Sequence, residues 1–205
     1  MDPRLKHPFT CMLSGPSGCG KSTLIQQILG HRDILIDPPV ERVVWYYSTW
    51  QPLYDTILDV EFVEGLPDLN SLDKKTRNLI VIDDLMEETD GNVAKIFTKF
   101  SHHCNTSCFY LVQALFNKNK QHRVISLNCH YMILFKNPRD RSEIVNLGKQ
   151  MYPGHTKFMH SVFEDATCKP HGYLFVDLKQ ETPEHLRLRT EIVPGQTQYV
   201  YLRRA

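Results

Sequence analysis

The sequence lacks the features that would place it among membrane, secreted or strongly basic proteins. Its 205 residues carry a formal net charge of only +1, so contact with nucleic acid would need a local basic patch. Its apolar runs stay well short of the roughly 20 residues that span a bilayer, so we expect no membrane segment. Its six cysteines show no spacing typical of a disulfide framework, and the polar N-terminal residues do not resemble a signal peptide. These absences predict a soluble protein in a reducing, intracellular environment.

The chain also lacks internal repeats, low-complexity tracts and linker-like segments. Apolar residues make up 41% of it and charged residues 23%, a balance typical of a globular protein. A length of 205 residues suffices for one α/β domain with a full core. We therefore predict a single domain over residues 1–205.

A glycine-rich segment near the start is the strongest motif that the sequence contains. Residues 15–22, Gly-Pro-Ser-Gly-Cys-Gly-Lys-Ser, match the phosphate-binding pattern G-x-x-x-x-G-K-[ST]. The apolar run 9–13 predicts a buried strand before it, and apolar residues at helical spacing over 24–29 predict a helix after it. This arrangement turns backbone N–H groups and the positive helix end toward a polyphosphate. The predicted nucleotide-binding residues are Gly15, Pro16, Ser17, Gly18, Cys19, Gly20, Lys21, Ser22 and Thr23.

Two side chains of this loop have predicted roles of their own. Lys21 can reach the β- and γ-phosphates, and the Ser22 hydroxyl can bind Mg²⁺. ATP and Mg²⁺ are therefore the predicted cofactors. The alternative is an ordinary strand-to-helix turn, although the flanking segments are those of a phosphate loop.

A second motif is an apolar run that ends in two carboxylates. Residues 79–82 are Leu-Ile-Val-Ile, and Asp83 and Asp84 follow them, which is the Walker B pattern of a central strand. Asp83 is the predicted acid at the metal, because Mg²⁺ prefers hard oxygen ligands. Asp84 is the predicted base for an attacking water, and Glu87 is the substitute for that role. The alternative is a polar turn at the end of a strand.

Gln113 supplies a third signal, because it ends the buried apolar strand predicted over 107–113. If that strand lies between the two motif-bearing strands, the Gln113 amide meets the γ-phosphate or the attacking water. The alternative is a polar residue that solvates a strand end.

Two arginines could stabilise the charge that develops during phosphoryl transfer. An arginine supplied in cis or in trans accelerates such reactions by about 10³–10⁵-fold. Arg123 ends a basic, polar segment, 117–123, that we predict to be a loop, and Arg139 follows the strand predicted over 130–135. Each could equally be a solvated arginine of a loop.

The remaining elements predict an α/β fold with a mostly parallel central sheet flanked by helices. The segment 51–58 is a possible short helix, and residues 60–67 fit a short edge strand that ends in a turn. At the C-terminal end a strand at 172–179 is followed by 186–193, which can pair with it as a β-hairpin. The other predicted strands cover 42–48 and 198–203, and the other predicted helices cover 92–103, 142–150 and 155–166.

The order of these motifs resembles one family of packaging enzymes. The segments that carry the resemblance are 15–23, 79–85, 110–116, 125–140 and 172–178. They look like the genome-packaging ATPases of Polinton (Maverick) elements and adintoviruses, which are similar to the poxvirus-type ATPases of the FtsK–HerA superfamily. The resemblance covers about residues 8–193. It implies a RecA/FtsK–HerA-like P-loop core with an additional strand.

The resemblance also implies a function and a set of partners. Such proteins form homo-oligomeric rings that use ATP to pull double-stranded DNA into a capsid, so the implied partners are DNA and a capsid or portal protein. The implied site of action is the host cytoplasm or nucleus, where virions assemble. Lys21 and Ser22 then bind nucleotide and Mg²⁺, Asp83 is the Walker B acid, and Gln113 is the sensor. An arginine finger acts in trans, for which Arg123 is the first candidate and Arg139 the second. One departure is that Asp84 stands where the wider superfamily usually has Glu.

Two other function classes stay open at this point. A small-molecule kinase shares the P-loop but usually has an arginine-rich lid, whereas the basic stretch 117–123 is short. A slow nucleotide-dependent switch protein would bind ATP with little turnover.

Overall fold

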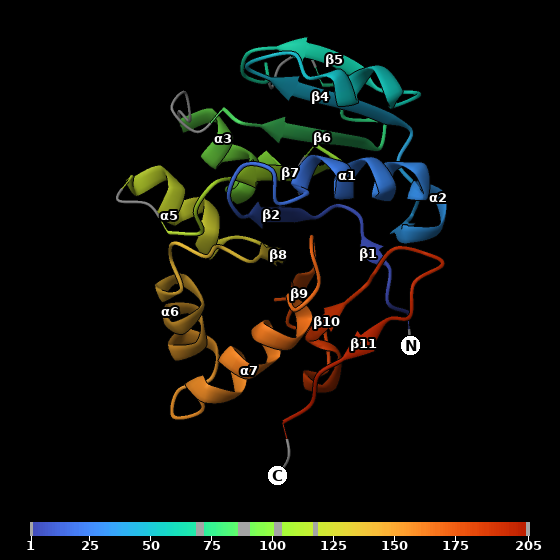
Figure 1. Ribbon diagram of the computed structural model, residues 1–205. Helices are drawn as coiled ribbons and strands as arrows, with labels where there is room; N and C mark the ends of the chain where they lie inside the picture. Colours follow the sequence, from blue (N-terminus) through green and yellow to red (C-terminus); the bar gives the residue numbers. More distant parts are fainter. Residues whose placement is uncertain (1, 69–71, 86–90, 101–103, 117–118, 204–205) are drawn as a thin grey trace.

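The computed structural model describes residues 2–68, 72–85, 91–100, 104–116 and 119–203, and at residues 92, 99 and 100 it describes only the backbone. One sheet of nine strands runs through the molecule, with helices on both of its faces (Figure 1). The strand order is β11-β10-β9-β8-β2-β7-β6-β4-β5. Its strands are β2 (Thr10–Ser14), β4 (Arg42–Tyr47), β5 (Glu61–Glu64), β6 (Asn78–Asp83), β7 (Thr106–Val112), β8 (Tyr131–Phe135), β9 (Tyr173–Asp177), β10 (Leu188–Thr190) and β11 (Tyr199–Val200).

The helices are short to medium in length, and none of those in the described part of the chain is both long and apolar enough to cross a bilayer. They are α1 (Lys21–Gly30), α2 (Arg32–Leu35), α3 (Gly91–Lys95), α5 (Lys120–Leu127), α6 (Ser142–Met151) and α7 (Thr156–Ala166), with 3-10 helices at Pro52–Thr56 and Glu184–Leu186 and a π-helical segment at Ile96–Phe100.

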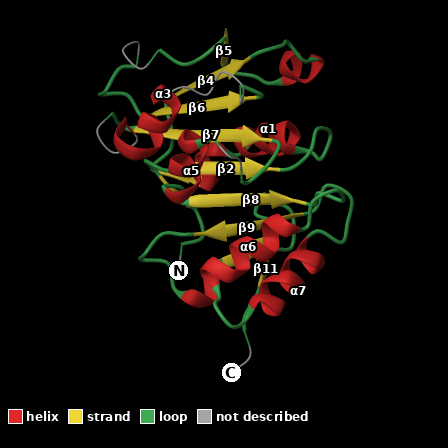
Figure 2. Cartoon of the chain, turned by 90° about the vertical axis from the view of Figure 1, so that its left-hand side faces the viewer, coloured by secondary structure: helices red, strands yellow, loops and turns green. Residues whose placement is uncertain are grey.

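The central strands are parallel, and this places their carboxyl ends at one edge of the sheet. β7 pairs with β2 on one side and with β6 on the other, and β8 pairs with the free side of β2. The register aligns Ser14 with Val112 and Asp83 with Leu111, so the residues that follow these strands meet at the same edge. β9, β10 and β11 continue the sheet as antiparallel strands (Figure 2).

Alternation along the strands gives the sheet a hydrophobic core on each face. Met12 of β2 joins one core, which α3, α5, α6 and α7 cover, whereas Cys11 and Leu13 join the other, which α1 covers. The residues of α1 that face the sheet are those predicted from helical spacing: Leu24, Ile25, Ile28 and Leu29 are all buried. The predicted fold class is thereby confirmed, including the C-terminal hairpin of β9 and β10.

Some parts of the fold differ from the sequence prediction. The segment 117–123 is not a loop throughout, because α5 begins at Lys120 with the Asn119 side chain accepting a hydrogen bond from the Gln121 amide at 2.8 Å. An asparagine cap of this kind satisfies an N–H group at the helix start, and the prediction overlooked it. A two-stranded parallel pair, β1 (Leu5–Lys6) with β3 (Ile36–Asp37), and helix α2 were also not predicted.

Candidate functional site

The glycine-rich loop connects β2 to α1 in a conformation that its glycines require. Gly18 and Gly20 have φ values of +77° and +108°, which other residues rarely adopt. A Cβ atom at Gly15 would lie 2.7 Å from Cβ of Phe135, so no side chain fits there. Gly20 precedes α1 and provides no side chain to cap it, which leaves the N–H groups of the first turn for an anion.

Lys21 folds back across this loop. Its Nζ donates hydrogen bonds to the carbonyl oxygens of Gly15 at 2.6 Å and of Pro16 at 3.2 Å. The ammonium group therefore lies over the concave side of the loop. When a phosphate enters, its oxygens can replace these carbonyls as acceptors.

Asp83 and Ser22 lie together beside the loop, and each has an oxygen atom that could bind a metal ion. The Ser22 hydroxyl donates to Oδ2 of Asp83 at 3.0 Å, and the hydroxyl of Tyr54 donates to the same oxygen at 3.0 Å. Burial raises the pKa of Asp83, and the hydrogen bonds from Ser22 and Tyr54 act against this rise. A carboxylate and a hydroxyl are hard oxygen ligands, so these residues fit a magnesium ion that reaches the phosphates.

Asp84 and Gln113 meet at the adjoining strand ends. Gln113 Nε2 donates to Oδ1 of Asp84 at 3.1 Å, and both side chains are exposed. Asp84 has a φ of +56°, which turns the chain sharply after β6 and separates its carboxylate from that of Asp83. The prediction for Gln113 required that its strand lie between the strand before the phosphate loop and the strand that ends in Asp83. β7 does lie between β2 and β6. Glu87, the substitute base, lies outside the described residues.

A cavity of about 260 Å³ joins these groups. Six residues of the predicted nucleotide-binding loop line it, as do Asp83, Asp84 and Gln113. Gly15, Pro16 and Cys19 are not among the lining residues, but their carbonyl oxygens accept hydrogen bonds from Lys21 and His171, which are. The loop residues that line the cavity are Ser17, Gly18, Gly20, Lys21, Ser22 and Thr23.

A second cavity of about 310 Å³ adjoins the first one, and both include Gly20, Thr23 and His171 in their walls. His171 lies between the two cavities with a φ of +60°. Its Nδ1 lies 3.1 Å from the Cys19 carbonyl oxygen, so this nitrogen carries the proton and donates. Gln27 of α1 and Glu191, just after β10, line the far side of the second cavity.

The sequence prediction missed several residues of this site. Tyr54 and its neighbours Gln51 and Leu53 come from the segment that was predicted only as a possible short helix. His171 comes from the turn before β9, which carries no motif. Their involvement depends on long-range folding, and no local pattern in the sequence marks it.

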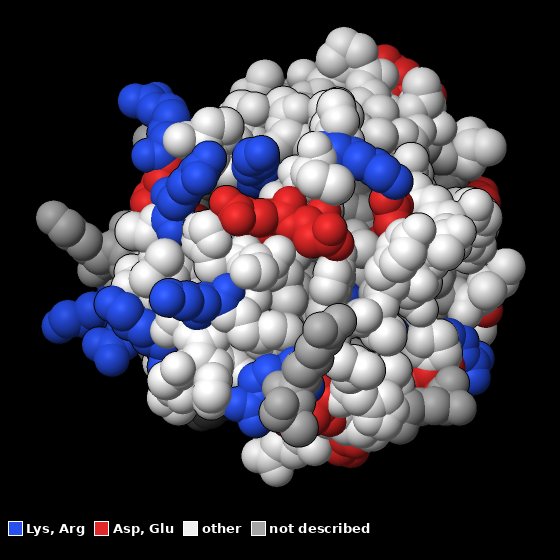
Figure 3. Space-filling model, turned by 60° about the horizontal axis from the view of Figure 1, so that its bottom comes forward, with Lys and Arg blue, Asp and Glu red and all other residues white. Residues whose placement is uncertain are grey.

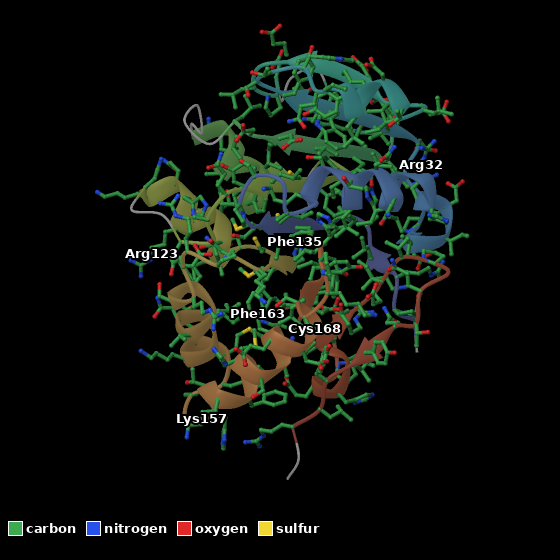
Figure 4. The ribbon with its side chains drawn as sticks, in the orientation of Figure 1. Arg32, Arg123, Phe135, Lys157, Phe163 and Cys168 are labelled. Carbon is green, nitrogen blue, oxygen red and sulfur yellow. The ribbon has the colours of Figure 1, made fainter. Side chains whose placement is uncertain are left out.

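The two candidate arginines lie apart from these cavities. Arg123 is exposed on α5 and points away from the body of the molecule (Figure 4). Arg139 is exposed in the turn between β8 and α6, at the carboxyl edge of the sheet. Neither side chain is part of the wall of either cavity.

Comparisons with known proteins support the fold. No protein-family profile matches the sequence, and no curated protein matches it. The structure is similar to that of the genome-packaging NTPase B204 from Sulfolobus turreted icosahedral virus 2 in complex with ATP-gammaS, with a TM-score of 0.55, 14% identity and 98% of each chain covered. It is similar also to B204, the DNA-packaging ATPase from Sulfolobus turreted icosahedral virus, with a TM-score of 0.56, 12% identity and 98% of each chain covered. At such identities the likeness shows the fold, a P-loop NTPase fold, and it extends over nearly the whole of both chains.

Proposed function

We propose that this chain is an ATP-hydrolysing motor that translocates double-stranded viral or transposon DNA into a capsid. The observation that carries the proposal is the joint placement of Lys21, Asp83 and Gln113 around one cavity, at the edge where the adjacent strands β2, β7 and β6 end. This placement is what an ATPase with an additional strand between its two motifs needs. The likeness to B204, described as a DNA-packaging ATPase, supports the choice of this class.

The two adjoining cavities fit the two halves of ATP. The cavity around the loop suits the triphosphate, because backbone N–H groups, Lys21 and Ser22 converge on it. The cavity beyond His171 suits the nucleoside, with the stem of Gln27 and the ring of Tyr173 as apolar walls and Glu191 as an acceptor for hydroxyl groups. The B204 complex with ATP-gammaS supports ATP as the nucleotide.

The residues of this chain have distinct tasks in hydrolysis. Asp84 accepts a proton from the attacking water, and the Gln113 amide orients the same water, since the two groups are within one hydrogen bond of each other. Ser22 and Asp83 would hold Mg²⁺, which supplies positive charge to the phosphates. The Lys21 ammonium group stabilises the negative charge that develops on the γ-phosphate during cleavage.

We infer that the positive charge still missing from this site comes from a neighbouring subunit of a homo-oligomeric ring. Arg123 and Arg139 are exposed, and they are the two candidates for this trans contact. Lys and Arg side chains gather on the side of the molecule where α5 and α6 lie, next to a band of acidic groups (Figure 3). Such a local basic patch can meet DNA phosphates although the chain is nearly neutral.

The finer assignment follows from the sequence resemblance. We propose that the protein belongs with the packaging ATPases of Polinton elements and adintoviruses, that a capsid or portal protein is its docking partner, and that it works where virions assemble in the host. A small-molecule kinase or a slow switch protein is less well supported, because the similar structures are described as a genome-packaging NTPase and a DNA-packaging ATPase.

ATP turnover with and without double-stranded DNA tests the proposal. We expect hydrolysis that DNA stimulates and that requires no small acceptor, with Lys21→Ala as the inactive control. Phosphate transfer to an added nucleoside or sugar would favour the kinase. Tight ATP binding with turnover that DNA leaves unchanged would favour the switch.

A further inference from the structure

Among the described residues, Tyr54 is the one from outside the known motifs whose buried hydroxyl reaches the proposed metal-binding carboxylate, Asp83. Its side chain is 1% exposed, and its hydroxyl donates to Oδ2 of Asp83 at 3.0 Å. Ser22 donates to this same oxygen at 3.0 Å. Two hydroxyl donors from different elements, α1 and the 3-10 helix at Pro52–Thr56, therefore converge on one oxygen of the carboxylate.

The ring of Tyr54 is fixed in place by aromatic neighbours. It stacks on Phe62 with centroids 5.1 Å apart and an interplanar angle of 22°, and the rings of Trp45 and Trp50 lie 5.3 and 5.4 Å away. These neighbours come from β4, β5 and the segment between them. A phenol held on several sides can direct its hydroxyl with little freedom, which is what positioning requires.

The segment that carries Tyr54 is also attached to the nucleotide-binding loop. Gln26 of α1 donates to the Thr56 hydroxyl at 2.8 Å, which ties the 3-10 helix to the helix that follows the loop. Gln51 and Leu53, which come just before Tyr54 in the chain, line the triphosphate cavity. Tyr54 itself is buried in the core directly behind this wall, and its hydroxyl reaches the site through Asp83.

We propose that Tyr54 is a positioning residue for magnesium binding, which holds Asp83 by Oδ2 so that the carboxylate presents its other oxygen toward the nucleotide. The inference rests on the proposed function as an ATPase. Partners that orient a metal-binding carboxylate matter for affinity, and their loss typically weakens metal binding by about 10–100-fold. A buried tyrosine that only satisfies its own hydroxyl would instead affect folding alone.

Tyr54→Phe tests this role, because it removes one oxygen and keeps the ring packing. The control is Tyr47→Phe: Tyr47 belongs to the same aromatic cluster, with its ring centroid 5.6 Å from that of Tyr54. Binding of ATPγS is measured by calorimetry in EDTA and again at increasing concentrations of Mg²⁺. We expect Tyr54→Phe to bind ATPγS like wild type in EDTA but to need about tenfold more Mg²⁺ for half-saturation. Tyr47→Phe should match wild type in both measurements.

The outcomes separate the inference from the proposed function. If Tyr54→Phe lowers the melting temperature but leaves the Mg²⁺ dependence unchanged, the residue is structural and the inference is overturned. If it weakens ATPγS binding equally with and without Mg²⁺, it acts on the nucleotide site as a whole, which also overturns the inference. If the wild-type chain binds no ATPγS in either condition, the proposed function fails, and the role of Tyr54 fails with it.

A second pair of variants tests whether the effect passes through Asp83. In an Asp83→Asn background, adding Tyr54→Phe should leave the Mg²⁺ requirement unchanged, because the carboxylate that Tyr54 positions is already gone. An effect of Tyr54→Phe as large in this background as in wild type would show that Tyr54 acts elsewhere.

Discussion

The edge of the sheet around the phosphate loop and the surface that carries the candidate arginines are built very differently. At the edge, polar side chains from separate elements bind one another directly, as Ser22 does with Asp83 at 3.0 Å and Gln113 with Asp84 at 3.1 Å. On the surface, Arg123 and Arg139 are exposed, and within the described part of the chain neither guanidinium makes an ion pair. One region is preorganised within a single chain, and the other carries exposed charges with no ion pair among the described residues.

This contrast suggests how the work of hydrolysis is divided. A preorganised site can bind ATP and place a water without help, since its geometry is fixed by strands. A reaction that also needs an arginine from a neighbour proceeds only after assembly, which keeps free subunits from consuming ATP. The variants below test this division, and they are ordered from the largest expected effect to the smallest.

Lys21→Ala should reduce turnover below detection, because it removes the cation that reaches the phosphates of ATP. Lys21 is half-buried, and its ammonium group contacts two loop carbonyls and the Cys19 thiol of the same loop, so its loss leaves no void in the core. We therefore expect the melting temperature without nucleotide to match that of wild type. Calorimetry with ATP and a turnover assay measure the effect, and turnover near the wild-type rate would remove the phosphate loop from the mechanism.

Asp84→Asn should lower turnover by about 10³-fold while ATP still binds, since general-base catalysis contributes on this scale. The amide keeps an oxygen that can accept from Gln113, so the local geometry should persist. The measurement is single-turnover hydrolysis next to ATP affinity. If this variant works at the wild-type rate, the role of base passes to Glu87, for which the matching variant is Glu87→Gln.

Arg123→Ala should lower the turnover number by about a hundredfold or more with little change in ATP affinity, because a trans arginine acts mainly in the transition state. Mixing this variant with Lys21→Ala subunits should restore part of the activity, since one supplies the pocket and the other the arginine. Arg141→Ala is the matched control, an exposed arginine that lies 3.7 Å from Glu164. Restored activity with Arg139→Ala instead of Arg123→Ala would identify Arg139 as the finger, and no restoration with either would contradict the trans arrangement.

The same two regions differ in how far the sequence predicts them. The phosphate edge was predictable because a fixed motif, two apolar runs and the geometry of parallel strands all indicate one place. The register bears this out by aligning Ser14, Val112 and Asp83 at neighbouring strand ends. Each of these patterns lies within a short stretch of sequence, and parallel pairing of the strands then places the residues at their carboxyl ends side by side.

The arginine-bearing surface was predicted less well, for a physical reason. The segment 117–123 is polar and basic, a composition typical of a loop, but the cap at Asn119 starts a helix that buries His122 to 2% exposure. His122 cannot contact DNA from there, and burial lowers its pKa so that it stays neutral. Lys118, in the same basic segment, lies outside the described residues. Tyr54 and His171 were missed for a related reason, because their roles depend on contacts with residues distant in sequence.

Glu143 connects the two regions, and its removal should have a moderate effect. Its Oε1 accepts hydrogen bonds from the backbone amides of Leu115 at 2.7 Å and Phe116 at 3.3 Å, which holds the segment after Gln113 against α6. Glu143→Ala should lower the free energy of unfolding by about 1–3 kcal/mol, because it leaves these amides without their acceptor. Turnover should fall several-fold as Gln113 loses its support. Denaturant unfolding measures the first effect, and Glu143→Gln, which keeps an acceptor oxygen, should restore most of both.

Lys120→Ala should have the smallest effect and should act on DNA alone. Lys120 is exposed at the start of α5, one turn before Arg123, and it makes no contribution to either cavity. A lysine that contacts a DNA phosphate displaces a counterion, so its removal should reduce the slope of log affinity against log salt by about one unit. Turnover without DNA should stay at the wild-type level. Lys157→Ala, at the start of α7 and well away from α5, is the control (Figure 4). If Lys157→Ala changes the slope and Lys120→Ala does not, DNA contacts the surface around α7. Arg123, on α5, would then lie away from the DNA.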